Sequence, residues 1–223
     1  MVGVFDSGMG GRFALAELRR LCGRVDIAFL SDEKNAPYGN KSESELEALV
    51  MHDIKTLRLM GAREILVACC TASTVCQRLS LPLREGVVPI IRPVARRALG
   101  TSKNGRIGVI STEATRRSGA FQKAIPGALC YSVPELVTMA EHGARDGNLT
   151  ADEKNKIRKM LSPFFDSGID TLVLGCTHFA YFEGEIENIL GVKTVNSARV
   201  GAEEFARIIC DEGNGMIRHA CVT

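Results

Sequence analysis

Two cysteines lie at equivalent places in a weak internal repeat, and they are the residues best suited to acid/base chemistry. Residues 61–69 (GAREILVAC) align without gaps on residues 168–176 (GIDTLVLGC), so that both copies end in a cysteine, Cys69 and Cys176. A thiol has an ordinary pKa of about 8.5, which its surroundings can shift. If the two copies face each other, one thiolate can remove a proton from a carbon and the opposite thiol can return one on the other face. That arrangement inverts a stereocentre and requires no metal or organic cofactor.

Polar side chains follow the apolar runs that read as strands, where an open parallel sheet binds its ligands. The clusters are Asp6-Ser7, Cys69-Cys70-Thr71, Ser111-Thr112 with Thr115, and Cys176-Thr177-His178. Asp6 and His178 can tune the thiols or relay protons, and Glu141 is a further candidate. A carbanion next to a carboxylate also needs donors that are in place before reaction. The hydroxyls suited to that task belong to Ser7, Thr71, Thr112 and Thr177.

Each of these features also has a structural interpretation. A free cysteine is most often a small buried hydrophobe, an Asp-Ser pair after a strand is most often a helix cap, and a lone histidine is most often hydrogen-bonded in a core. Zinc could in principle be held by Cys69, Cys70, Cys176 and His178. However, the paired spacing typical of zinc sites is missing from the sequence. A dinucleotide loop after the first strand is excluded because its last small residue is replaced by Phe13.

Apolar runs alternate with helical patterns along the whole chain, which indicates β-α-β units and parallel sheets. Strands are predicted over 2–5, 27–30, 65–68, 107–110 and 172–174. Helices are predicted from about 14 to 21 and over 42–60, 71–79, 113–124, 150–166, 183–190 and 199–210. Ser42 with Glu45, and Thr150 with Glu153, have the spacing of capping boxes. Residues 3–7 also align on 108–112 at nearly the same offset as the cysteine repeat, so two similar α/β halves are expected.

Composition narrows the class of protein. The chain has 223 residues, 45% of them hydrophobic, and a net charge of +2, which gives no overall basic field for nucleic acid. Four crowded arginines, Arg92, Arg96, Arg97 and Arg106, are interpreted as an exposed helix face rather than an anion site. No signal-peptide pattern or membrane-spanning apolar run is found, and eight cysteines are too few for a disulfide scaffold. We therefore expect a cytoplasmic protein with free thiols and no membrane partner.

Five ordered motifs resemble those of the glutamate racemases, within the aspartate/glutamate racemase superfamily. They are residues 2–11 (VGVFDSGMGG), Asp32 with 37–39 (PYG) and 41–42 (KS), 67–73 (VACCTAS), 107–109 (IGV) with Thr112 and Thr115, and 174–178 (LGCTH). The resemblance covers nearly the whole chain. It implies two flavodoxin-like parallel-sheet domains related by a pseudo-two-fold axis, with the active site in the cleft between them. The domains would comprise residues 1–92 with 197–223, and residues 93–196.

The resemblance also implies a reaction and its residues. The activity would be cofactor-independent, metal-free racemisation of glutamate in the bacterial cytoplasm, supplying D-glutamate for peptidoglycan, and a homodimer is the usual assembly. Cys69 and Cys176 would be the acid/base thiols, assisted by Asp6 and His178, with Asp32 and Glu141 as further candidates. The small-molecule amino-acid substrate would be held by Ser7, Tyr38, Gly39, Cys70, Thr71 and Thr177.

The sequence departs from the family pattern at four places. Cys70 stands where the family has Asn, Phe179-Ala180 where it has Tyr-Pro, Asn35 where it has Arg, and Asn196-Ser197 where it has Asp-Ser. A thiol is a poorer donor than an amide. Cys70 therefore leaves open a racemase for aspartate or another amino acid. The departures together leave open a catalytically silent homologue that binds an acidic metabolite.

Overall fold

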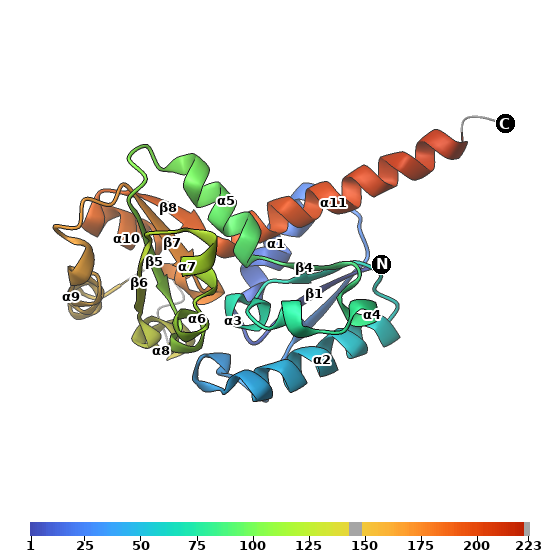
Figure 1. Cartoon of the computed structure of the whole chain (residues 1–223), viewed down its shortest axis with the longest axis horizontal. Coiled ribbons are helices and arrows are strands. Elements are labelled where there is room, and N and C mark those ends of the chain that lie inside the picture. The colour runs from blue at the N-terminus through green and yellow to red at the C-terminus, as the bar shows by residue number, and fades with distance from the viewer. Residues whose placement is uncertain (143–148, 221–223) are drawn as a thin grey trace.

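Two parallel four-stranded sheets with the same strand order form the frame of the molecule (Figure 1). The structure is a computed structural model that describes residues 1–142 and 149–220, with the side chains up to residue 210. The first sheet has the order β2-β1-β3-β4 and the second β6-β5-β7-β8. The first is built from β1 (Val2–Asp6), β2 (Ile27–Ser31), β3 (Ile65–Val67) and β4 (Val87–Pro89). The second is built from β5 (Ile107–Ser111), β6 (Leu129–Ser132), β7 (Thr171–Gly175) and β8 (Lys193–Asn196).

The internal repeat is confirmed by this topology. Strands β1 and β5 hold equivalent positions in the two sheets, and so do β3 and β7. Gly61 and Gly168, which begin the two aligned segments, both have a positive φ, at 93° and 69°. The repeat therefore reflects two similar α/β halves, called here the first and second lobes after the two sheets. The expected fold of two flavodoxin-like parallel-sheet units is confirmed.

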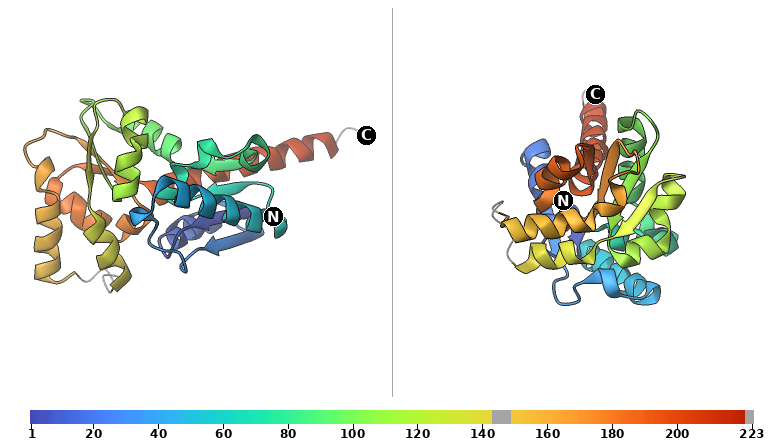
Figure 2. Two further views of the ribbon diagram at one scale, coloured as in Figure 1. Left: turned by 60° about the horizontal axis from the view of Figure 1, so that its bottom comes forward. Right: turned by 90° about the vertical axis from the view of Figure 1, so that its left-hand side faces the viewer.

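Helices cover the sheets of both lobes (Figure 2). The first lobe carries α1 (Gly11–Cys22), α2 (Glu43–Leu59), α3 (Cys70–Ser73) and α4 (Leu81–Arg84), with 3₁₀ turns η1 (Tyr38–Asn40) and η2 (Cys76–Arg78). The second carries α6 (Glu113–Ser118), α7 (Ala120–Ala124), α8 (Pro134–His142), α9 (Ala151–Met160) and α10 (Glu183–Leu190), with η4 (Ser162–Phe164) and η5 (Thr177–Phe182). Helices α5 (Ile91–Thr101) and α11 (Ser197–Ala220) pack on each other at the junction of the lobes, from which α11 extends outwards beside α1.

Local signals explain where the helices begin and where two expected helices break. Both capping boxes are present, with Ser42 at the start of α2 and Thr150 at the start of α9. The helix predicted over 113–124 is divided at Gly119, whose φ of 64° is left-handed and unfavourable for other residues. The helix predicted over 71–79 is wrong in length, since α3 ends at Ser73 and a separate 3₁₀ turn follows.

One apolar core joins the two lobes. It includes Val4 and Leu66 from the first sheet, Val109 and Val173 from the second, and Phe205 from α11. Further clusters lie under α2 in the first lobe and under α8 to α10 in the second. The shared core includes residues of α5 and α11 and holds the two lobes together on the side away from α2 and α8. The opposite side, at the carboxyl ends of the strands, is where the two lobes can hold a ligand between them.

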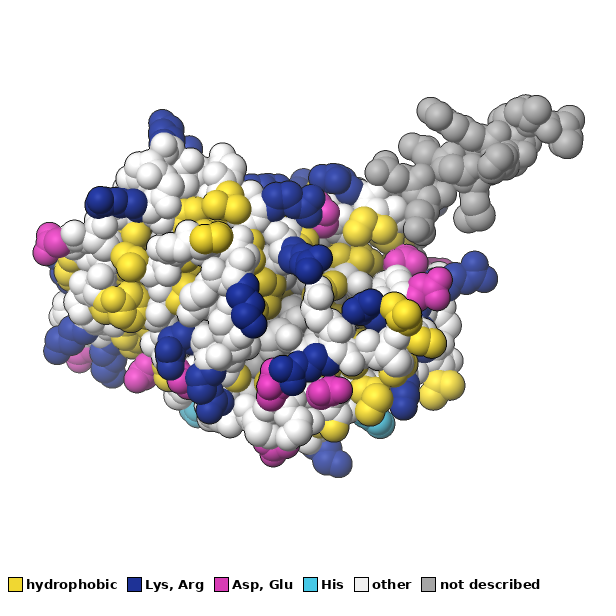
Figure 3. Space-filling model, viewed as in Figure 1, with side chains coloured by type: hydrophobic (Ala, Val, Ile, Leu, Met, Phe, Trp, Pro, Cys, Tyr) yellow, Lys and Arg dark blue, Asp and Glu magenta, His cyan; other side chains and the backbone are white. Residues whose placement is uncertain are grey.

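Three of the four crowded arginines, Arg92, Arg96 and Arg97, lie on an exposed face of α5 as expected, whereas Arg106 is exposed beyond the end of that helix at Thr101. Arg96 pairs with Glu204 at 3.1 Å and Arg97 with Glu203 at 2.7 Å, both glutamates lying on α11. On the face shown in Figure 3, Lys and Arg side chains are spread over both lobes with acidic side chains among them. Such exposed pairs contribute about 0–1 kcal/mol each. Over the part of the chain that the structure describes, no helix has the length and apolar character needed to cross a bilayer.

Candidate active site

A narrow cleft of about 90 Å³ opens between the lobes at the carboxyl ends of the strands. Residues from both lobes line it, and they include most of those singled out from the sequence. These are Ser7, Tyr38, Gly39, Cys69, Thr71, Thr112, Glu141, Cys176, Thr177 and His178. Ala36, Pro37, Asn40, Pro134, Val137 and Thr138 complete the lining. Two segments 107 residues apart in the sequence thus bring one cysteine each to a single cleft.

Cys69 is presented by the first lobe at the end of β3. It caps α3, and its sulfur accepts a hydrogen bond from the Ala72 N–H at 3.5 Å. The Ser7 hydroxyl, from the loop after β1, lies 3.3 Å from the same sulfur. Burial raises the pKa of the Cys69 thiol to about 11, and the nearby Asp6 carboxylate raises it further while Ser7 opposes the shift. At neutral pH the Cys69 thiol is therefore protonated.

Cys176 is presented by the second lobe directly after β7. Its sulfur lies 3.7 Å from Nδ1 of His178, and Nε2 of that ring lies 3.6 Å from a Glu141 carboxylate oxygen. Burial raises the pKa of Cys176 well above its ordinary value, and burial also lowers the pKa of His178 to about 4. The imidazole is therefore neutral at pH 7, and in one tautomer its Nδ1 can accept a hydrogen bond from the thiol.

Asp6 lies behind the cleft rather than in its lining. Its side chain is fully buried, accepts hydrogen bonds from the Gly8 N–H at 2.9 Å and the Thr177 hydroxyl at 3.1 Å, and so ties the first lobe to the second. Burial raises the pKa of Asp6 to about 7, with the Gly8 and Thr177 hydrogen bonds acting in the other direction. Asp6 is thus placed to influence Cys69 by its charge.

Three threonine hydroxyls meet where the lobes approach each other. The Thr71 hydroxyl of the first lobe lies 2.8 Å from that of Thr112 and 3.0 Å from that of Thr115, both of the second lobe. Thr112 and Thr115 are themselves 3.0 Å apart, and Thr112 caps α6. Each hydroxyl has one hydrogen, which can rotate towards an anion in the cleft. The sequence singled out these threonines but did not show that they would touch across the lobes.

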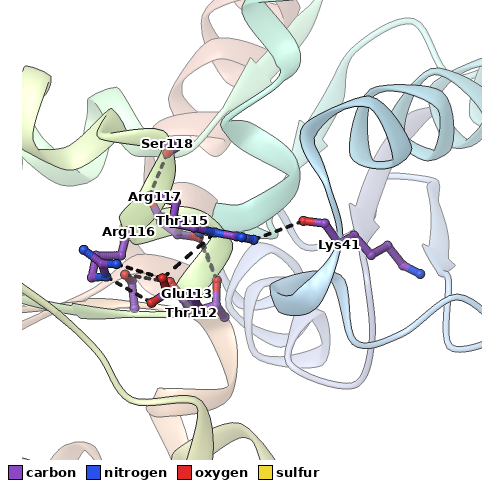
Figure 4. A network of polar contacts seen from close by, with 8 residues as sticks. Lys41, Thr112, Glu113, Thr115, Arg116, Arg117 and Ser118 are labelled. Atoms are coloured by element: carbon purple, nitrogen blue, oxygen red, sulfur yellow. Dashed lines mark hydrogen bonds and ion pairs between the residues drawn. The ribbon is translucent and has the colours of Figure 1, made fainter.

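The same helix makes a second contact across the cleft (Figure 4). Arg117 of α6 donates to the Lys41 carbonyl, just after η1, at 3.4 Å. Glu113 and Arg116 pair beside it at 2.7 Å. Helix α6 therefore contacts the first lobe both at Thr71 and at the segment that carries Tyr38 and Gly39.

Gly10, in the loop after β1, allows the second lobe to come this close. A Cβ atom at Gly10 would lie 2.2 Å from Oγ1 of Thr177 and 2.9 Å from the backbone nitrogen of His178. A Cβ atom at Gly8 would lie 3.7 Å from the His178 ring, which is an ordinary contact. Gly10 thus sets the distance between the loop after β1 and the segment that carries Cys176.

The structure places the Cys70 side chain in the core and not in the lining of the cleft. Cys70 is 2% exposed and packs in the core that joins the lobes, and it is not part of the cleft lining. The physical reason is the helix that begins there. Cys69 is the extended cap residue of α3 and Cys70 is its first helical residue, and only Cys69 lines the cleft.

Asp32 contributes to the site only through Tyr38. It accepts a hydrogen bond from the Tyr38 hydroxyl at 2.7 Å and is not part of the lining. A second carboxyl, that of Asp53 in α2, lies 2.9 Å from the same hydroxyl. Asp53 was not among the residues singled out from the sequence. Its position within the apolar stripe of the helix predicted over 42–60 could have indicated a buried carboxyl. Among the described residues, no group of three or more His, Cys, Asp or Glu side chains is arranged to hold a metal ion.

Comparison with known proteins agrees with this geometry. The family model for Asp/Glu/Hydantoin racemase matches residues 25–205. A glutamate racemase of Aquifex aeolicus is 35% identical over 97% of this chain and 86% of its own length. A glutamate racemase structure from Bacillus anthracis superposes with a TM-score of 0.87 at 31% identity, covering 96% of this chain and 82% of the other. A glutamate racemase of Francisella tularensis in complex with D-glutamate gives 0.83 at 25% identity, covering 95% and 81%.

The matches extend over nearly all of the chain, and they include both cysteine segments and both sheets. The motifs quoted from the sequence, the paired sheets and the cleft with one thiol from each lobe all agree with them. The chain belongs to the Asp/Glu/Hydantoin racemase family.

Proposed function

We propose that this protein interconverts L- and D-glutamate without a cofactor. The observation that carries the proposal is the presence of Cys69 and Cys176 in one cleft, each supplied by a different lobe. One thiolate removes the Cα proton, and the electron pair stays on the substrate as a carbanion. The opposite thiol then gives its proton to the other face of the carbon, so each turnover leaves the proton transferred from one sulfur to the other. The relatives and the D-glutamate-bound structure support glutamate as the substrate.

Forming a thiolate in this cleft needs charge that the substrate brings with it. With a pKa of about 11, ionising Cys69 at pH 7 costs roughly 5 kcal/mol, since one pKa unit is about 1.4 kcal/mol. An α-ammonium group within ~4 Å of the sulfur returns about 4 kcal/mol at an effective dielectric constant of ~20. An α-ammonium group near the sulfur therefore favours the thiolate when an amino acid is bound.

The two thiols have different neighbours, and we assign them different assistants. His178 is assigned to Cys176 as the residue that orients its sulfur, from 3.7 Å through Nδ1, while Nε2 of the ring lies 3.6 Å from a Glu141 carboxylate oxygen. Asp6, which titrates near neutrality, is the nearest carboxyl to act on Cys69 by its charge. The substrate carboxylates and amine are held by Ser7, Tyr38, Gly39, Thr71 and Thr177, all of which line the cleft.

The direct test is incubation of the protein in D₂O with L- and D-glutamate, and separately with the two enantiomers of aspartate. Deuterium at Cα of glutamate together with loss of optical rotation is the expected result. Exchange with aspartate alone would identify a different substrate, and no exchange with either amino acid would support a silent homologue. The measurement needs only NMR or mass spectrometry of the recovered amino acid.

The buried position of Cys70 leads to a prediction that differs from the substrate-contact interpretation. Cys70→Ser should keep kcat/KM for glutamate within about threefold of the unchanged protein, because the side chain lies in the core. The melting temperature should fall by a few degrees, because a hydroxyl replaces a thiol in apolar surroundings. Steady-state kinetics with circular dichroism melting checks both. A loss above tenfold in kcat/KM without a change in melting temperature would show that the Cys70 side chain contacts the substrate.

The domain division follows from the same proposal. We assign residues 1–92 with 197–223 to one domain and residues 93–196 to the other. This division is supported by the sheets, whose strands fall within residues 2–89 and 107–196. The reaction needs free thiols, which favours the reducing cytoplasm, where D-glutamate would serve peptidoglycan synthesis. A homodimer belongs to the proposal and is tested by size-exclusion chromatography with light scattering.

A further inference from the structure

Two carboxyl groups share one phenol beside the cleft. The Tyr38 hydroxyl lies 2.7 Å from Oδ2 of Asp32 and 2.9 Å from Oδ2 of Asp53. The phenol has one hydrogen and can donate it to only one of these oxygens. If both carboxyls were ionised, the other contact would set two lone pairs against each other at hydrogen-bond distance. The group formed by Tyr38, Asp32 and Asp53 therefore holds one proton besides that of the phenol. One of the two carboxyls carries it.

The contacts of the two carboxyls indicate which one holds that proton. Asp32 accepts from the Tyr38 hydroxyl and also from the Asn35 side-chain amide, at 3.0 Å to each oxygen. Both oxygens of Asp32 therefore have donors. Asp53 is 4% exposed, and Tyr38 is its only hydrogen-bond partner recorded among the described side chains. The extra proton is best placed on Asp53, which then donates to the phenol oxygen while the phenol donates to Asp32.

We propose that Asp53 is a positioning residue, which in its protonated form fixes Tyr38 and thereby the 36–40 segment that lines the substrate cleft. The inference rests on the proposed glutamate racemisation only for its kinetic consequence. Ala36 to Asn40 all line the cleft, and the Tyr38 ring, 1% exposed, is the anchor of this segment in the core beneath it. Ionisation of Asp53 would break the anchor's second contact and loosen the segment.

Titration of Asp53 falls within the working range of the protein. Burial raises the pKa of Asp53 to about 6, with the Asp32 charge raising it further and the Tyr38 hydroxyl and exposed His52 acting in the opposite direction. In the unfolded chain the pKa is about 4. Because the folded value is raised, protonated Asp53 contributes stability that is fully present below pH ~4 and is lost as the pH rises through about 6.

The experiment compares the unchanged protein with Asp53→Asn, Asp53→Ala and the control Glu47→Gln between pH 5.5 and 8.5. Glu47 lies on the same helix, is partly exposed, and loses the same charge. An asparagine at position 53 can donate an N–H to the Tyr38 oxygen at every pH. An alanine makes no such contact.

The expected kinetic result is a pH-dependent KM that only the Asp53 variants change. In the unchanged protein and Glu47→Gln, KM for glutamate should rise by at least tenfold from pH 6 to pH 8, since the protonated fraction of Asp53 falls roughly fiftyfold. In Asp53→Asn, KM should vary less than about twofold over that range. Compared with the unchanged protein at the same pH, Asp53→Ala should raise KM about tenfold at pH 6 and hardly at all at pH 8. The variants should share the pH profile of kcat.

A second readout does not depend on turnover. The melting temperature of the unchanged protein, relative to that of Asp53→Asn, should fall as the pH rises from 5 to 8. The assignment of the proton to Asp53 is wrong if KM depends on pH in the same way in both proteins and the difference between their melting temperatures does not change with pH. If no glutamate is turned over at all, the proposed function fails, and the melting comparison still decides the role of Asp53.

Discussion

Replacement of Cys176 by alanine is expected to abolish net interconversion of L- and D-glutamate while leaving exchange at Cα in one enantiomer only. Cys69 remains on its own face of the cleft, with Ser7 at 3.3 Å from its sulfur, and can still remove a proton there. The opposite face has lost its donor, so the proton returns from the side it left. Racemisation should fall by at least roughly 10³-fold, the usual contribution of one acid/base group.

Cys69→Ala should show the opposite preference, since Cys176 and His178 are intact in that variant. The measurement is deuterium incorporation from D₂O into each enantiomer, beside optical rotation. Absence of exchange in a variant carries less weight, because removal of one thiol also alters the bound geometry. Full racemisation by either single variant would show that two opposed thiols are not needed and would refute the mechanism.

Cys76→Ala is the matched control for both variants. Cys76 is a third buried cysteine of the first lobe, 1% exposed, whose pKa burial raises to about 12. Its sulfur donates to the Ala72 carbonyl and it does not line the cleft. The control should keep glutamate racemisation within a few-fold of the unchanged protein. A large loss there would mean that cysteine removal disturbs the fold in general.

Sequence reasoning located the two thiols because the repeat that carries them is a property of the fold. Strands β3 and β7 hold the same place in two similar sheets, so the residues that follow them occupy equivalent positions. The short strands β4, β6 and β8 and the helices α4, α5 and α8 were not predicted. Strand β6 alternates between exposed and partly buried positions at a sheet edge, where the apolar pattern is weak.

Contacts between the lobes were beyond the reach of sequence patterns. The Thr71 and Thr112 hydroxyls meet across 41 residues of chain, and Thr177 reaches Asp6 across 171. Periodicity shows which face of an element is apolar but not which polar groups of two elements will touch. Cys70 illustrates the same limit at short range, since its neighbour Cys69 faces the cleft and it does not.

Gly10→Ala is expected to lower kcat/KM for glutamate by about 10²-fold in a protein that still folds. The added methyl group would lie 2.2 Å from the Thr177 hydroxyl and 2.9 Å from the His178 nitrogen, and the latter is backbone that cannot rotate away. The backbone of Gly10 is right-handed helical, with φ of −57°, so alanine meets no conformational strain there. The whole effect must therefore come from the contact between the lobes.

We expect that contact to set how closely Cys176 approaches the substrate. Relief of the overlap moves the 176–178 segment away from the first lobe, which lengthens the Thr177–Asp6 hydrogen bond and withdraws Cys176 from the substrate. Proton transfer needs the reacting atoms about 3–3.5 Å apart, and a displacement near 1 Å can cost ~10²-fold. The same overlap should lower the unfolding free energy by only about 1–3 kcal/mol.

Gly8→Ala supplies the matched control, because it adds the same methyl group two residues away. Its Cβ would lie 3.7 Å from the His178 ring, which is ordinary van der Waals contact. We expect kcat/KM within about fivefold of the unchanged protein, measured in both reaction directions beside the melting temperature. Equal activities for the two alanine variants would mean that the approach of the loop after β1 to Thr177 and His178 does not set the catalytic geometry. A hundredfold difference between them, at similar melting temperatures, would trace the loss to the separation of the lobes.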